Sequence, residues 1–325
     1  MEEKGIFSKV KVETIFEDSV SIRAISFKKH VLFYAGNNGK YGYINLENLA
    51  EKHAFQLPIN AEFRSVASTE KADFILSAGS PAVLYEVNGL GKQHLNYSEE
   101  GEKVFYDSMK FWNDQEGIAV GDPTENCLSI IITRDSGKTW KKIPCVDLPK
   151  TVPGEAAFAA SNSNIDIVGD NTWLISGGMK SRVYFSPDKG KTWEVFNTPL
   201  VQGKPTTGGY SIDFYNDKIG IIFGGDYTAP NENKANKAIT FYSGETWELL
   251  AVGEFPGYKS CVQFVPGSNG REIVAVGPSG IAYSSNFGKT WSEISTEPFY
   301  TIRFVSGSVA YAAGKNRICK LQFEN

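Results

Sequence analysis

The apolar residues of this chain gather in short stretches that end in glycine, and none of them has the spacing of an amphipathic helix. Each stretch is rich in β-branched and aromatic residues and stops at a turn residue, which is typical of buried strands. Seven stretches share this character and predict the same strand in seven successive units: residues 30–36, 73–79, 117–121, 172–177, 219–225, 272–277 and 309–314.

A second pattern, eight residues long, recurs four times along the chain. It has the frame Ser/Thr-x-Asp-x-Gly-x-Thr-Trp, with a different residue at the Asp position in two of the copies. The copies end at Trp140, Trp193, Trp247 and Trp291, which lie 53, 54 and 44 residues apart. A repeat period of about 40–50 residues indicates a solenoid or a β-propeller.

The frame has the chemistry of a hairpin turn. Its Asp can accept hydrogen bonds from turn amides, its Gly supplies a positive φ, its Thr returns the chain to a strand, and its Trp supplies an apolar wedge. Asp135 and Asp188 hold the Asp position in the first two copies, Asn286 can replace Asp in the fourth, and Tyr242 cannot do so in the third. We expect a structural role for the frame, with the third turn held least tightly.

The frame resembles the Asp-box, or bacterial neuraminidase repeat, of sialidases, sortilin-type receptors and photosystem II assembly/stability-factor-like proteins. The resemblance rests on four copies between residues 133 and 291, and it implies a β-propeller. The chain is most similar to the seven-bladed, photosystem II assembly/stability-factor-like propellers of bacteria, some of which are labelled glycosyl hydrolases.

The number of blades can be counted independently by pairing each glycine-ended strand with the strand before it. The inner strands then begin near Ser21, Phe63, Tyr106, Ala156, Tyr210, Lys259 and Tyr300. The last unit has room for three strands only, while residues 9–16 alternate like a strand that belongs to no earlier unit. We therefore predict an all-β fold, one seven-bladed β-propeller domain over residues 1–325 with four-stranded blades, whose ring is closed by the N-terminal strand.

Charge and hydropathy exclude several classes of protein. The 33 Lys and Arg residues and 37 Asp and Glu residues give a net charge of −4, without the basic field of a nucleic-acid binder. No apolar run approaches the roughly 20 residues that cross a bilayer, and residues 1–16 lack the apolar segment of a signal peptide. We expect a monomer with no nucleic-acid partner and no membrane insertion. We also expect a periplasmic or secreted protein whose signal peptide is not part of this sequence, with a cytoplasmic location as the alternative.

The sequence contains no motif with the residue spacing of a known cofactor-binding or metal-binding site. Gly-Lys-Thr occurs in three copies of the frame, but the earlier glycine of a phosphate-binding loop is absent from all three. No metal ligand accompanies any of the three histidines, which are His30, His53 and His94. We expect no cofactor and no metal, while the acidic loop at residues 121–126 leaves a calcium site open.

Two of the four cysteines are placed to pair. Cys127 and Cys145 lie at facing positions of the hairpin that turns at residues 135–138. A disulfide between them is a hypothesis that would indicate an oxidising compartment, and two buried free thiols are the alternative.

Candidate binding residues follow from the geometry of a propeller. The loops between the second and third strands, and those between blades, lie on the face opposite the repeated turns. Binding residues are usually carried by loops on a rigid scaffold, so we expect them at this rim of the central channel. The candidates are Arg23, Arg64, Asp107, Asp122, Glu155, Arg182, Tyr210, Asp226, Tyr258, Lys259, Tyr300 and Arg317.

Two classes of function fit this rim. A non-catalytic binding or assembly scaffold would use its Tyr and Arg side chains to recognise a protein or glycan ligand. A sialidase-like or other glycoside hydrolase or lyase would need three arginines for a carboxylate, a Tyr paired with Glu, and an Asp acid. Arg23 and Arg64 occupy matching positions, but Arg303 should point to the other face of its strand. We favour the scaffold, and the catalytic residues of the enzyme alternative stay unassigned.

Overall fold

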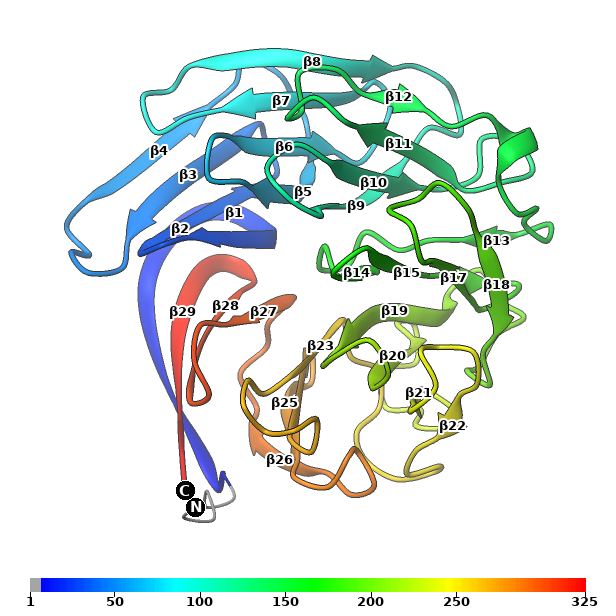
Figure 1. Ribbon diagram of the computed structural model, residues 1–325. Coiled ribbons are helices and arrows are strands. Elements are labelled where there is room, and N and C mark those ends of the chain that lie inside the picture. The colour runs from blue at the N-terminus through cyan, green and yellow to red at the C-terminus, as the bar shows by residue number, and fades with distance from the viewer. Residues whose placement is uncertain (1–6) are drawn as a thin grey trace.

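The computed structural model describes residues 7–325, in which 29 β-strands and one short 3-10 helix, η1 (Cys145–Asp147), are arranged in a ring (Figure 1). Within this part of the chain no helix has the length and apolar character needed to cross a membrane. The strands pair into antiparallel units of four, which we call blades, with the first strand of each blade nearest the centre of the ring.

Blades 2 to 4 follow one another along the chain. Blade 2 consists of β5 (Phe63–Ser68), β6 (Asp73–Ser77), β7 (Ala82–Val87) and β8 (Gln93–Glu99). Blade 3 consists of β9 (Tyr106–Phe111), β10 (Gly117–Gly121), β11 (Ser129–Thr133) and β12 (Lys141–Lys142). Blade 4 consists of β14 (Ile165–Val168), β15 (Asn171–Ile175), β17 (Arg182–Ser186) and β18 (Glu194–Asn197).

Blades 5 and 6 repeat this pairing. Blade 5 consists of β19 (Thr207–Phe214), β20 (Gly220–Asp226), β21 (Lys237–Thr240) and β22 (Glu248–Leu249). Blade 6 consists of β23 (Cys261–Phe264), β24 (Ile273–Gly277), β25 (Gly280–Ser284) and β26 (Ser292–Ser295). Two short strands, β13 (Glu155–Ala156) and β16 (Gly177–Gly178), extend the sheet of blade 5 beyond β19.

One long strand, β1 (Lys9–Lys28), belongs to two blades and closes the ring (Figure 1). Its first half pairs with β29 (Lys315–Glu324) and completes blade 7 together with β27 (Thr301–Phe304) and β28 (Val309–Ala313). Its second half pairs with β2 (Val31–Gly36) and begins blade 1, which continues with β3 (Lys40–Asn45) and β4 (Lys52–Gln56). The pairing thus gives seven blades, and the predicted closure by the N-terminal strand is confirmed.

The repeated frame forms the turn between the third and fourth strands of blades 3 to 6. In the first copy, Asp135 accepts hydrogen bonds from the backbone N–H and the hydroxyl of Thr139 at 2.9 and 2.7 Å, and from the Thr133 hydroxyl at 2.9 Å. Two adjacent residues have positive φ, Ser136 at 66° and Gly137 at 82°. The sequence predicted this conformation for the glycine alone.

The third copy has a sparser set of hydrogen bonds because Tyr242 holds the Asp position. The backbone N–H groups of Tyr242 and Gly244 still donate to the Thr240 hydroxyl, at 3.0 and 3.2 Å. The three bonds that Asp135 accepts in the first copy have no counterpart at Tyr242 among the described residues.

Each tryptophan of the frame packs between its own blade and the preceding one. The Trp140 ring centre lies 6.3 Å from that of Phe74 in blade 2 and 5.7 Å from that of Phe111 in blade 3. A Cβ atom on Gly137 would lie 2.3 Å from the Phe74 ring, so this close approach requires glycine. Equivalent clusters join the next three pairs of blades at Trp193, Trp247 and Trp291.

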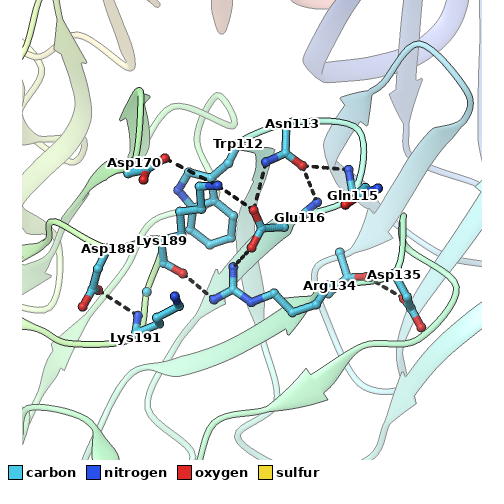
Figure 2. A network of polar contacts seen from close by, with 12 residues as sticks. Trp112, Asn113, Gln115, Glu116, Arg134, Asp135, Asp170, Asp188, Lys189 and Lys191 are labelled. Carbon is cyan, nitrogen blue, oxygen red and sulfur yellow. Dashed lines mark hydrogen bonds and ion pairs between the residues drawn. The ribbon is translucent and has the colours of Figure 1, made fainter.

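A charged network ties the first two repeated turns together (Figure 2). Glu116, between β9 and β10, accepts hydrogen bonds from Lys189 Nζ at 2.6 Å, Arg134 Nη1 at 2.8 Å and Asn113 Nδ2 at 2.9 Å. The hydrogen bonds from Lys189 and Asn113, together with the charge of Arg134, lower the pKa of Glu116 to about 2. In this network the charges of Glu116, Arg134 and Lys189 compensate one another.

The start of the fourth inner strand differs from the prediction. The sequence placed it near Ala156, whereas β14 begins at Ile165. The intervening residues 157–164 enter the central channel instead of joining the blade. Alanine, serine and asparagine make up all but one of these residues, and such small side chains let a backbone segment fit inside the ring.

Candidate functional site

The segment at residues 157–164 divides the central channel into two mouths. The carbonyl groups of residues 159–162 accept hydrogen bonds from Arg64, Arg23 and Arg303 at 2.8 to 3.5 Å. These arginines come from blades 2, 1 and 7, far from the segment in sequence. Side chains therefore satisfy backbone groups that no strand pairing could satisfy at this position.

The side chain of Asn162 fixes the segment to blades 2 and 3. Its Nδ2 donates to the Val66 carbonyl at 2.8 Å, and its Oδ1 accepts the Met109 backbone N–H at 3.0 Å. Ser161 Oγ donates to the Ser260 carbonyl at 2.7 Å. Contacts on many sides of the ring hold the segment in place, which makes it a rigid floor for the mouth above it.

The mouth opposite the repeated turns is a pocket of about 560 Å³, which we call the mouth pocket. Residues 157–160 form its floor. Six of the twelve candidate residues line it: Arg23, Arg64, Asp122, Tyr210, Tyr258 and Tyr300. Its size is that of a site for a small ligand or for the end of a larger one.

Two arginines of the mouth pocket have spare hydrogen-bond donors. The Arg23 guanidinium lies 4.1 Å from the centre of the Tyr300 ring, and Arg64 Nη2 pairs with Glu62 at 2.8 Å. Within residues 7–325, the buried Nε atoms of Arg23 and Arg64 have no hydrogen-bond partner. Burial and the nearby charge of Arg64 lower the pKa of Arg23. Two adjacent cations with unused donors favour an anionic ligand, and a carboxylate suits their planar geometry.

Aromatic rings form one wall of the mouth pocket. The Phe158 and Tyr210 rings are stacked with centres 4.0 Å apart, and the Tyr258 ring meets Tyr210 edge-on at 4.9 Å. The Tyr210 hydroxyl donates to the Thr206 carbonyl at 2.8 Å, which fixes the ring. Rigid aromatic surfaces of this kind provide contact area for apolar groups or sugar faces.

Two carboxyl groups lie on the blade 3 side of the site. Asp122 lines the pocket and accepts the Ala157 backbone N–H at 2.8 Å, and its burial raises its pKa to about 6. Asp107 is fully buried beside Arg64 and the Ala159 backbone N–H. Burial, together with the charge of Asp122, raises the pKa of Asp107 well above its usual range and outweighs the lowering effect of these two groups. Asp122 therefore titrates closer to neutral pH than an ordinary aspartate.

The other candidates have internal partners and do not line the mouth pocket. Arg182 binds the fully buried Glu155 carboxylate at 2.6 Å. Asp226 accepts hydrogen bonds within its own loop at 2.6 and 2.9 Å. Lys259 is buried and donates to two oxygens at 2.8 and 3.0 Å, and Arg317 pairs with a glutamate at 2.6 Å. These side chains stabilise loops near the rim.

Arg303 lies at the opposite mouth. It lines a separate pocket that also contains Lys110, Asp166, Asp213 and Gln263. The mouth pocket therefore has two arginines, and the arrangement of three arginines around one carboxylate is absent from it.

The floor of the mouth pocket is the part of the site that sequence reasoning missed. The signal was a run of small residues at 156–163, interrupted only by Phe158. This run lies between the first copy of the frame, which ends at Trp140, and the predicted strand at residues 172–177. A run of this composition lacks the β-branched residues of the other inner strands, which could have marked it as something other than a strand.

The cysteines and acidic groups complete the inventory of reactive residues. Cys127 and Cys145 form a disulfide with a Cα–Cα distance of 5.5 Å, and Cys261 and Cys319 are buried free thiols. Across residues 7–325, no three His, Cys, Asp or Glu side chains are grouped so that they could hold a metal ion.

Comparisons with known proteins identify the fold. No family model and no curated protein matches the chain. Three similar solved structures are described as YCF48 bound to D1 peptide (TM-score 0.68, 16% identity, 98% of both chains), RRP9 WD40 repeats (0.69, 10%, 96% of this chain and 97% of that one) and streptogramin B lyase (0.72, 13%, 99% and 100%). At these identities the similarity shows a β-propeller fold and nothing finer. The three include a peptide complex and an enzyme.

Proposed function

We propose that this protein is a binding scaffold whose mouth pocket holds a carboxylate-bearing segment of a partner protein. The observation that carries this proposal is the pair of adjacent arginines, Arg23 and Arg64, that line the mouth pocket while their Nε donors have no partner among the described residues. A carboxylate in the pocket would face two guanidinium groups, whose planar donor arrangement matches its own geometry.

The surroundings of the mouth pocket support an extended ligand. A neighbouring groove of about 690 Å³ shares Phe105, Asp122 and Ala156 with the mouth pocket and is lined by the loops around residues 102–105, 122–126 and 151–156. A peptide could place its carboxylate at the arginines and its preceding residues along this groove. The similar structure of YCF48 is described as bound to a peptide, which is in keeping with this mode of binding. We also propose that the repeated frame is the Asp-box.

The proposal is tested by screening peptides that carry either a free or an amidated C-terminus, together with N-acetylneuraminic acid and glucuronic acid. We expect saturable binding of some free-carboxylate peptides by fluorescence polarisation or calorimetry, and at least tenfold weaker binding by Arg23→Gln. Arg317→Gln is the matched control, since Arg317 is also an arginine near the rim but is paired with Glu297 and does not line the pocket. Equal binding by the Arg23 variant and the wild type would contradict the proposal.

A carbohydrate-active enzyme at the same site is the second candidate function. The observation that favours it is the carboxyl pair, because Asp122 with a pKa of about 6 beside the buried Asp107 has the properties of a general acid. The test is turnover of sialyl, uronic and neutral glycosides by the wild type and by Asp122→Asn. Turnover that disappears in the variant supports the enzyme, and no turnover by the wild type rejects it.

We further propose that the protein is a monomer and works in an oxidising compartment. The disulfide between Cys127 and Cys145 supports this location, because such bonds persist outside reducing cytosol. Intact mass after alkylation with and without reductant tests the disulfide, and light scattering on a sizing column tests the monomer.

A further inference from the structure

The mouth pocket has a charged half and an aromatic half. Arg23 and Arg64, from blades 1 and 2, form the charged half. Phe158 of the floor, with Tyr210 and Tyr227 of blade 5, forms the aromatic half. Blade 5 lies across the ring from blades 1 and 2 (Figure 1). A ligand that fills the mouth pocket therefore meets guanidinium groups on one side and aromatic rings on the other.

Tyr227 is an exposed ring on a fixed turn at the edge of the aromatic half. The residue is 53% exposed, and its ring meets Tyr210 edge-on with the ring centres 6.4 Å apart. Oδ1 of the preceding Asp226 accepts the backbone N–H of Thr228 at 2.9 Å and the Thr228 hydroxyl at 2.6 Å. This short turn holds the backbone on both sides of Tyr227. A ring presented in this way loses little conformational freedom when a ligand binds.

The floor sets the distance between the two halves. Arg23 Nη1 donates to the Ala160 carbonyl at 3.1 Å, and Phe158, two residues earlier, stacks on Tyr210 with ring centres 4.0 Å apart. Two residues of backbone span at most about 7 Å. The backbone also turns here, since the Ala160 N–H donates to the Phe158 carbonyl at 2.7 Å. One terminal residue of a peptide can therefore reach both halves, with its carboxylate on one and its side chain on the other.

The aromatic half favours a terminal side chain that is itself a ring. The described residues that line this half carry no charged group; they are Phe158, Pro205, Tyr210, Tyr227 and Tyr258. A charged terminal side chain would lose its water there without gaining a counter-ion. An aromatic side chain would instead gain contacts between ring faces and ring edges.

We propose that the partner segment ends in an aromatic residue and that Tyr227 selects for it. This inference rests on the proposed function, because it assigns the carboxylate between Arg23 and Arg64 to that terminal residue. The ring of the same residue packs against Phe158 and Tyr227. Asp226 is a positioning residue, since it acts through the turn that carries Tyr227.

The test compares two N-acetylated tripeptides, glycyl-glycyl-phenylalanine and glycyl-glycyl-alanine, by calorimetry with the full chain. We expect the wild type to bind the phenylalanine peptide at least fivefold more tightly than the alanine peptide. Tyr227→Ala should remove this preference, and Tyr227→Phe should keep it. Tyr242→Ala is the matched control, because Tyr242 is also an exposed tyrosine, at 67%, but lies in a repeated turn on the opposite face.

Two variants test the positioning role of Asp226. Asp226→Ala removes the acceptor of the turn and should weaken binding of the phenylalanine peptide as much as Tyr227→Ala does. Asp226→Asn keeps a side-chain oxygen in the same place and should bind this peptide like the wild type. Equal binding by Asp226→Ala and the wild type would overturn the positioning role.

The outcomes separate this inference from the proposed function. Equal affinities of the wild type for the two peptides, absence of saturable binding of the phenylalanine peptide, or a preference that survives in folded Tyr227→Ala would overturn the selection of an aromatic terminus. If Arg23→Gln still weakens both peptides at least tenfold, the carboxylate site stands without that selection. If Arg23→Gln binds the phenylalanine peptide as tightly as the wild type does, the proposed function fails as well.

Discussion

The two mouths of the central channel have similar polar residues but differ in how those residues are used. At the mouth on the side of the repeated turns, Asp166, Asp213 and Gln263 each accept the backbone N–H of the next inner strand at 2.6 to 3.0 Å. At the other mouth, Arg23 and Arg64 keep buried donors without partners within residues 7–325. The arginines of the mouth pocket therefore keep unused donors, whereas these three acceptors of the opposite mouth are used within the ring.

The largest expected effect concerns the repeated turns. Trp140→Ala removes an indole that packs between blades 2 and 3, so we expect a loss of about 3–5 kcal/mol in the free energy of unfolding. Urea denaturation followed by far-UV circular dichroism measures it. Ligand binding at the mouth pocket should survive in the folded variant, and its loss would contradict the division between the two faces.

A pair of arginine variants compares the two mouths directly. Arg303→Ala removes charged hydrogen bonds to two carbonyls of the segment at residues 157–164, which we call the channel-crossing segment. We therefore expect a loss of about 2–4 kcal/mol in the free energy of unfolding. Arg23→Ala removes one such bond, of 3.1 Å, and should cost only about 1 kcal/mol while abolishing ligand binding. The reverse order of stabilities in urea denaturation would contradict the comparison.

Asp107→Asn should stabilise the protein by about 1–2 kcal/mol at pH 8, because it replaces a buried carboxyl group with an amide that stays neutral at every pH. The raised pKa of Asp107 means that the folded wild type favours the protonated form. The protonated Asp107 carboxyl group therefore contributes to the free energy of unfolding at low pH, and this contribution is lost as the pH rises above the usual aspartate range. The gap between variant and wild type should therefore widen from pH 4.5 to pH 8 in urea denaturation, and a variant less stable at both values would contradict this account.

The smallest expected effect is a repair of the third repeated turn. Tyr242→Asp restores the carboxylate that accepts three hydrogen bonds in the first copy, and we expect a gain of about 0.5–1 kcal/mol. The melting temperature from calorimetry measures it. A variant as stable as the wild type would show that the other contacts of this turn already hold it fully.

The fold could be predicted from the sequence because the information for it is local. The repeated frame, the glycine-ended strands and the unmatched residues 9–16 each depend on neighbours within one blade or on a regular spacing. The channel-crossing segment could not be predicted, because contacts such as that between Arg303 and Ser161 join residues 142 positions apart. Repetition gives no indication of an element that occurs once.

The candidate site was predictable in part for the same reason. Repeat geometry alone places Arg23, Arg64 and Tyr300 at equivalent positions around the mouth. Whether such a side chain is free or has an internal partner depends on loops that the repeat does not determine. The ion pair between Glu155 and Arg182 is such a case, because it joins β13, which extends the sheet of blade 5, to β17 of blade 4.

The most direct test of the central claim is a titration of one selected free-carboxylate peptide against the wild type and Arg23→Gln/Arg64→Gln, with the amidated peptide alongside. The account expects saturable binding of the free-carboxylate peptide by the wild type alone, and at least tenfold weaker binding of the amide. Equal affinities of the wild type and the double variant, with both folded, would show that the mouth pocket is not the binding site.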